Sequence, residues 1–139
     1  MMKLLFTSIF LFLLALGGCE TDFSARVSKE RAQNAINKWL RDYGLPDKTR
    51  GFDKGQEARV TVTKVYGYGS APRDSYANLQ LNGFKYWDAN GQDQSYTGKA
   101  LLTFRDVGNQ KWVIVRLAFE SDGGVISTEF FPAEKIEVD

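Results

Sequence analysis

The stretch YTGKALLTFRDVGNQKWVIVRLAF, residues 96–119, decides the fold. Its first part, 96–106, places small or apolar residues at every second position, which is the spacing of a strand with one buried face. These residues are Ala100, Leu102 and Phe104. Gly108 and Asn109 supply a turn, and a second apolar run follows over 112–120. Because parallel neighbours need a long crossover, a connection this short predicts an antiparallel hairpin.

The run 112–120 carries apolar side chains on both faces of the expected strand. One face would hold Val113, Val115, Leu117 and Phe119. The other would hold Trp112 and Ile114, together with Leu101 of the preceding strand. A sheet with one solvated face normally alternates apolar and polar residues, and this one does not. Either the sheet has a core on both sides, closed by the C-terminal tail or by the loop 46–56, or its second face binds a ligand or partner.

The candidate binding face follows from the second alternative. It consists of Leu101, Trp112, Ile114 and Arg116. Arg116, like Lys64 on an earlier strand, could neutralise an acidic ligand, although long basic side chains also extend to water from an apolar surface.

Three further strands are expected around this hairpin. One begins at Ala58 and alternates through Val62, with a change of phase at Lys64-Val65 that suggests a bulge. The second covers 76–87 and is disturbed at Asn82-Gly83, and the third covers 125–131. Turn residues at 88–91 and 122–124 join them by short connections, so all of these neighbours should be antiparallel.

A helix is expected from Val27 onward, with Ser28 as its N-cap. Its apolar stripe comprises Ala32, Ala35, Ile36, Trp39, Leu40 and Tyr43. Gly44 should end the helix, because glycine accepts the left-handed conformation of a C-terminal cap. The helix must bury this stripe against one face of the sheet.

The fold class is therefore α+β: one N-terminal helix packed on a curved antiparallel sheet of four to five strands. This order resembles the cystatin-like and NTF2-like rolls, and residues 96–119 look like the paired long strands of small exported members of that group. Cystatin inhibitors carry Gln-x-Val-x-Gly in a hairpin, and this chain has no such string, so protease inhibition does not carry over. NTF2-like domains usually have more helices before the sheet.

The N-terminus has the sequence pattern of an export signal. After Lys3 an apolar run covers 4–16, which is shorter than the roughly 20 residues of a membrane-spanning helix. Leu16-Gly17-Gly18-Cys19 resembles the lipobox of bacterial lipoproteins. The resemblance implies that residues 1–18 are removed and that Cys19 carries lipid. The polar and small residues that follow predict a lipidated tether over 19–26, and the remaining 27–139 have the size of one domain. A buried N-terminal helix in a cytosolic protein is the alternative.

By the same resemblance, Glu20 in place of an aspartate favours the outer membrane, facing the periplasm, if the source has two membranes.

The amino-acid composition excludes several kinds of catalytic site and partner. The 139 residues include no histidine and one cysteine, so the Ser-His-Asp and Cys-His arrangements are unavailable. The net charge of +1 predicts no nucleic-acid partner, since phosphate contacts dominate that affinity. We expect no cofactor, and a lipid-anchored, non-catalytic envelope domain that binds a protein or small ligand. The alternatives are a small enzyme using carboxylates or lysine in an NTF2-like pocket, and a purely structural envelope component.

Two other patterns in the sequence have simple structural interpretations. Residues 88–93 are rich in Asp and Asn, like the start of a calcium-binding loop. Such a loop has glycine at its sixth position and glutamate at its twelfth, where this chain has Asp93 and Lys99. A hairpin turn is therefore the better interpretation. An aromatic group could stack on a sugar or peptide, although aromatics near strand ends usually pack within the sheet. This group comprises Tyr66, Tyr68, Tyr76, Tyr86 and Trp87.

Overall fold

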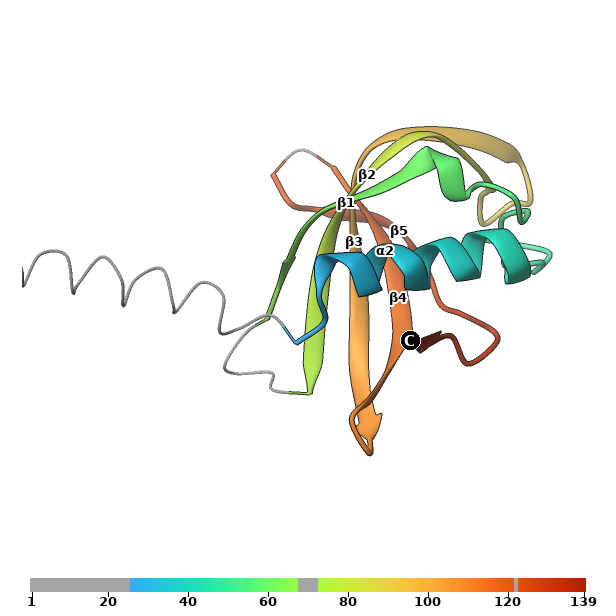
Figure 1. Ribbon diagram of the computed structural model, residues 1–139. Coiled ribbons are helices and arrows are strands. Elements are labelled where there is room, and N and C mark those ends of the chain that lie inside the picture. Colours follow the sequence, from blue (N-terminus) through green and yellow to red (C-terminus); the bar gives the residue numbers. More distant parts are fainter. Residues whose placement is uncertain (1–25, 68–72, 122) are drawn as a thin grey trace, which may run out of the picture.

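The computed structural model describes residues 26–67, 73–121 and 123–139, and the expected α+β architecture is confirmed (Figure 1). One helix lies across a curved antiparallel sheet with the order β1-β2-β3-β4-β5, and β6 pairs with β4 off this path. The strands are β1 (Val60–Tyr66), β2 (Asp74–Trp87), β3 (Asp93–Gly108), β4 (Lys111–Glu120), β5 (Ile126–Phe130) and β6 (Glu137–Val138). The strand number is six rather than four to five, because the C-terminal tail adds β6.

The helix α2 (Lys29–Lys38) begins as the sequence predicts. Ser28 is the N-cap, and its side chain accepts a hydrogen bond from the backbone N–H of Arg31 at 3.2 Å. Val27 before the cap is 1% exposed and packs in the same core as Ala32. The cap and the buried residue before it fix where the chain enters the domain.

A π-helical turn, η1 (Trp39–Tyr43), follows α2 and ends at Gly44, whose φ of 62° is the expected glycine stop. The wider turn is closed by the bond from the Gly44 N–H to the Trp39 carbonyl. It leaves Tyr43 39% exposed, so the assignment of Tyr43 to the buried stripe is wrong. The other members of the stripe are buried.

The core lies between α2 and the concave side of the sheet. The Trp39 ring meets Phe52 edge-on at 5.3 Å between centroids, and Phe52 in turn meets Phe84 and Phe130. Phe52 comes from the expected loop 46–56, which is tied down by isolated bridges from Leu45 to Phe52 and from Gly51 to Trp87. This loop therefore contributes to the core while remaining irregular.

Breaks in strand pairing produce the curvature. The register shifts between Val62 and Lys64, where the sequence predicts a bulge, and again between Leu81 and Phe84, around Asn82-Gly83. In Figure 1 the far end of the β2–β3 hairpin curls toward the helix side of the sheet. Ala58, expected at the start of a strand, lies instead in the 3-10 turn η2 (Glu57–Arg59), so β1 begins at Val60.

The β2–β3 connection is a hairpin turn, as predicted. The carboxylate of Asp88 accepts hydrogen bonds from the backbone N–H groups of Asn90 and Gln92 and from the side-chain amide of Gln94. The bond from the Gln92 backbone contributes most to lowering the pKa of Asp88, because it stabilises the ionised form.

Candidate functional site: the outer face of the sheet

The predicted binding face does not exist as a single surface. Trp112 is 8% exposed and Ile114 is 3% exposed, and both belong to the core on the helix side. Leu101 and Arg116 are half-buried on the opposite, outer face. The prediction that these four residues share one open face is therefore wrong.

A bulge in β4 explains the error. Thr103 pairs with Arg116, but the next residue of β3, Phe104, pairs with Ile114, so Val115 is the additional residue. One extra residue exchanges the two faces of a strand, because side chains alternate with a period of two. Leu117 and Ile114 consequently both point into the core, although simple alternation would place them on opposite sides.

The strand register defines the outer face as three neighbouring rows of side chains. The first row is Tyr66, Tyr76, Thr103 and Arg116. The second is Lys64, Asn78, Leu101, Ala118 and Glu129. The third is Thr61, Gln80, Lys99 and Glu120. The intervening residues of β2, such as Ala77, Leu79 and Leu81, are buried in the core.

An open trough lies between the second and third rows. Its cavity has a volume of about 390 Å³ and is lined by five long polar side chains, with Thr63, Leu79 and Ala100 beside them. These five are Lys64, Asn78, Gln80, Lys99 and Glu120. A second cavity of about 570 Å³ shares three of the five and extends toward the β4–β5 turn at Gly123 and Gly124. We call the two cavities together the outer trough.

The floor of the outer trough is held by Tyr96. Its hydroxyl lies 2.6 Å from the carbonyl oxygen of Lys99 and 2.9 Å from that of Glu120, and so it links β3 to β4. The Tyr96 ring stacks on Phe119 with 4.2 Å between centroids and an interplanar angle of 3°. The backbone beneath the trough is therefore tied to the core.

Two lysines provide the positive charge of the trough. Lys64 is opposite Asn78 and Lys99 is opposite Gln80, so the lysines stand on the two sides of β2, about 10 Å apart across the sheet. Within the described part of the chain, neither lysine forms an ion pair. The Lys64 ammonium lies 6.0 Å from the centroid of the Tyr66 ring, which itself stacks on Tyr76. The two cations outnumber the one carboxylate of the trough, Glu120, so a net positive charge remains that can attract a carboxylate, while the two amides can bind an adjacent amide.

A buried polar spot lies in the first row of the outer face, outside the lining of the trough. The Arg116 guanidinium forms an ion pair with Glu129, but its Nε is buried and has no hydrogen-bond partner. The hydroxyl of its cross-strand neighbour Thr103, which is 6% exposed, is also buried without a partner. Buried polar atoms are normally satisfied by protein or by water.

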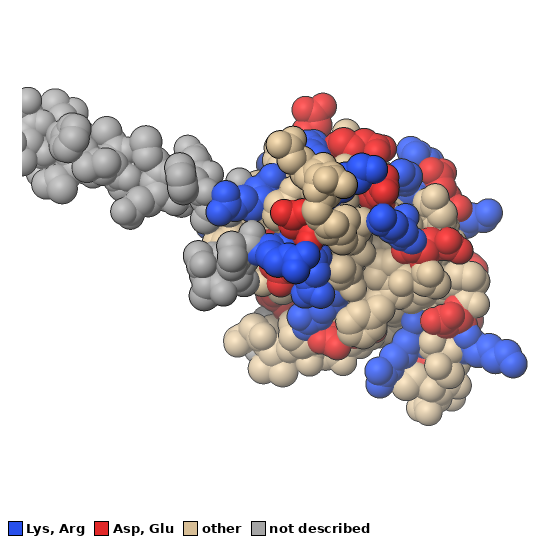
Figure 2. Space-filling view, turned by 90° about the horizontal axis from the view of Figure 1, so that it is seen from below, with Lys and Arg blue, Asp and Glu red and all other residues tan. Residues whose placement is uncertain are grey.

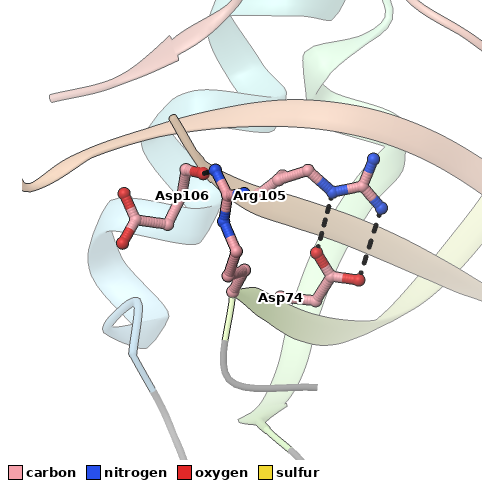
Figure 3. A network of polar contacts seen from close by, with 4 residues as sticks. Asp74, Arg105 and Asp106 are labelled. Carbon is pink, nitrogen blue, oxygen red and sulfur yellow. Dashed lines mark hydrogen bonds and ion pairs between the residues drawn. The ribbon is translucent and has the colours of Figure 1, made fainter. Parts of the chain in front are cut away.

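The nearby charged groups at the end of the sheet pair with one another (Figure 3). Arg105 makes two bonds to the Asp74 carboxylate, at 2.9 and 3.4 Å, and this hydrogen-bonded pairing raises the pKa of Arg105. Arg73 donates to the carbonyl oxygen of Asp106, which joins the start of β2 to the end of β3. These contacts hold the end of the sheet together.

The five aromatic residues do not form one platform. Tyr66 and Tyr76 stack on the outer face, whereas Tyr86 packs edge-on against the core residue Phe119. Trp87 donates from its indole to the carbonyl oxygen of Asp47. Tyr68 lies outside the described residues. Tyr86 and Trp87 instead line a separate open cavity of about 490 Å³ at the far end of the β2–β3 hairpin.

Charge on the molecule is mixed. Figure 2 shows Lys and Arg side chains interspersed with Asp and Glu over the face seen from below. Across the described ranges, no group of three acidic or cysteine side chains is placed to hold a metal ion. None of the helices in these ranges is both long and apolar enough to cross a membrane.

Sequence reasoning identified Lys64 and Arg116 but not Lys99, Gln80 and Glu120. The signal for the missed residues is that they alternate with buried residues of β2, β3 and β4, which assigns them to one common face. Cys19 lies outside the described residues. Comparison with known proteins finds no matching family model, no matching curated protein and no matching solved structure.

Proposed function

We propose that this protein is a lipid-anchored domain of the bacterial cell envelope that binds a small ligand carrying a carboxylate and an amide. The observation that carries the ligand assignment is the outer trough, where Lys64 and Lys99 flank the amides of Asn78 and Gln80. Lysine ammonium groups attract a carboxylate, and side-chain amides both donate to and accept from an amide. The proposed role is binding rather than catalysis.

The anchor is proposed from the resemblance of Leu16-Gly17-Gly18-Cys19 to a lipobox. Lipid on Cys19, with two or three chains, holds a protein stably, because each buried CH₂ contributes about 0.8 kcal/mol. The chain between Cys19 and the buried Val27 is short, at most about 25 Å when extended, so the domain would sit close to the membrane. If the source has two membranes, Glu20 favours the outer one, facing the periplasm.

The fold supports a relationship to the cystatin-like and NTF2-like rolls, which we also propose. The supporting observation is one helix, α2, crossing the concave side of an antiparallel sheet whose long strands β2 and β3 bend together near Leu81.

The anchor is tested by Cys19→Ser in cells grown with labelled fatty acid. We expect the substituted protein to lose the label and to leave the membrane fraction. Label retained at the wild-type level would show that the lipid is not on this cysteine.

The ligand assignment is tested with a pair of probes that differ in one charge: N-acetylalanine and N-acetylalanine amide. The full chain in detergent micelles should bind the acid at least ten times more tightly than the amide, by calorimetry. The double variant Lys64→Gln/Lys99→Gln should lose this preference. Lys111→Gln, an exposed lysine at the start of β4 and outside the trough, is the matched control and should keep it. Equal affinity for the two probes would refute the assignment.

A further inference from the structure

The two edges of the sheet differ in how they are covered. At β1 the Gln33 side chain, reaching from α2, donates to the Val60 carbonyl at 3.2 Å and accepts from the Val62 N–H at 2.8 Å. A side-chain amide thus occupies the backbone groups that another strand would use. An uncovered edge strand presents unpaired N–H and C=O groups and is a template for a further strand.

The edge at β5 has no such cover among the described residues. Its ladder is made with β4, and the two other backbone bonds in this region, from Ser121 to Val125 and from Gly124 to Ser121, lie within the β4–β5 turn. Natural edges are often protected by lysine or proline within the strand. The five residues of β5 include neither, and its one charged residue, Glu129, is paired with Arg116.

A groove follows this free edge. It has a volume of about 430 Å³ and is lined on one side by four consecutive residues of β5, from Ile126 to Glu129. Because successive residues of a strand point to opposite faces, a groove lined by all four runs along the backbone edge. Arg50, Asp88 and Ala89 line it as well. The Asp88 carboxylate is already engaged in its own turn, whereas Arg50 forms no ion pair in the described ranges.

Two exposed apolar side chains flank the strand. Val125 is 62% exposed and Phe131 is 57% exposed, which makes them the most exposed large hydrophobic residues in the described chain. They stand immediately before and after β5, about 20 Å apart along an extended backbone. An extended segment laid against β5 would cover both.

We propose that the free edge of β5 binds an extended peptide segment of another protein by strand addition. The segment would be apolar near its two ends, beside Phe131 and Val125 in an antiparallel arrangement, with an acidic residue near its centre for Arg50; the register of β5 shifts at Ser127, so the pairing is not one-to-one along the whole strand. In this mode the backbone bonds supply affinity, and the side chains at the two ends supply specificity. The site is separate from the outer trough and does not depend on it.

The probe is an acetylated and amidated heptapeptide with phenylalanine first, glutamate fourth, valine seventh and threonine elsewhere, labelled through a flexible linker. Fluorescence anisotropy with the full chain in detergent micelles should show saturable binding. Val125→Lys and Phe131→Lys should each weaken it at least tenfold with unchanged melting temperature. Val107→Lys is the matched control, because Val107 is 44% exposed near the β3–β4 turn, and it should bind as the wild type does.

A second probe tests the backbone. The same heptapeptide with N-methyl groups at alternate positions cannot complete a strand ladder, and its affinity should fall at least tenfold. Undiminished binding of the methylated peptide, equal binding to both lysine variants, or no saturable binding at all would overturn the proposal. Sedimentation of the chain alone tests for a second copy as occupant. A wild-type dimer that Phe131→Lys dissociates would replace the foreign peptide with a second copy and overturn the proposal.

Discussion

The bulge at Val115 predicts opposite outcomes for two adjacent apolar residues. Ile114 is 3% exposed and lies in the core with Leu117 and Phe119, whereas Val115 is the unpaired residue and is half-buried on the outer side. Strict alternation from Leu117 would reverse the two, placing Val115 inside and Ile114 outside. The pair Ile114→Ala and Val115→Ala therefore tests the course of β4 directly.

The expected losses of unfolding free energy follow from how deeply each side chain is buried. Truncating a buried isoleucine to alanine costs about 2–5 kcal/mol, because transfer energy is lost and a cavity is left. We expect about 3 kcal/mol for Ile114→Ala, which for a domain of this size lowers the melting temperature by about 10 °C. Val115→Ala removes two methyl groups from a half-buried site and should cost at most about 1 kcal/mol.

The assay is urea unfolding of the full chain in a non-denaturing detergent, followed by circular dichroism, with thermal melting as a second measurement. Equal m-values would show that both variants unfold from the same native state. A larger loss for Val115→Ala than for Ile114→Ala would refute the bulge and return Ile114 to the outer face. Equal losses would mean that the strand is covered on both sides.

Three further predictions concern the helix, the β1 edge and the β2–β3 turn. Trp39→Ala should cost about 3–5 kcal/mol in urea unfolding, whereas Trp39→Phe keeps a ring against the core and loses the 2.9 Å bond to the Gly44 carbonyl and part of the ring volume, about 1–3 kcal/mol; equal costs would argue against a role for the ring. Gln33→Leu should cost about 1–2 kcal/mol by removing two bonds at the β1 edge, while Asn34→Leu at an exposed helix position should change the unfolding free energy little. Because the pKa of Asp88 is lowered in the folded protein, its stabilising effect is present above the ordinary carboxyl pKa of about 4 and is lost as the pH falls through the lowered value. The melting temperature of wild type should therefore exceed that of Asp88→Asn at pH 7 and approach it in strong acid, and a constant difference would contradict this linkage.

Local signals in the sequence predicted most of the fold because each carries its own physical cause. The Ser28 cap, the Gly44 stop and the turn after Trp87 are made by residues whose conformational preferences are strong without any tertiary contact. The phase change at Lys64 and the disturbance at Asn82-Gly83 were visible because the alternation breaks there.

The features that sequence reasoning missed depend on tertiary context. The bulge at Val115 falls within Val113-Ile114-Val115, where each residue is apolar and β-branched, so no change of hydrophobicity marks the extra residue. β6 has two residues and forms because Ile136 and Val138 find space in the core beside Trp112. Misplacing Trp112 and Ile114 on an open face followed from both omissions.

The same bulge connects the curvature of the sheet to its polar outer face. β4 pairs with β5 through residues 117–120 and with β6 through Trp112 and Val113, and the bulge lies between these two pairings. Bulges increase local twist, so β4 can bend around the core and meet both partners. With Ile114 and Trp112 turned inward, Arg116 stays on the outer face beside Thr103, where its Nε is buried without a partner. The bulge that closes the core thus also leaves unsatisfied hydrogen-bonding capacity on the outer face of the sheet, the same face that carries the outer trough.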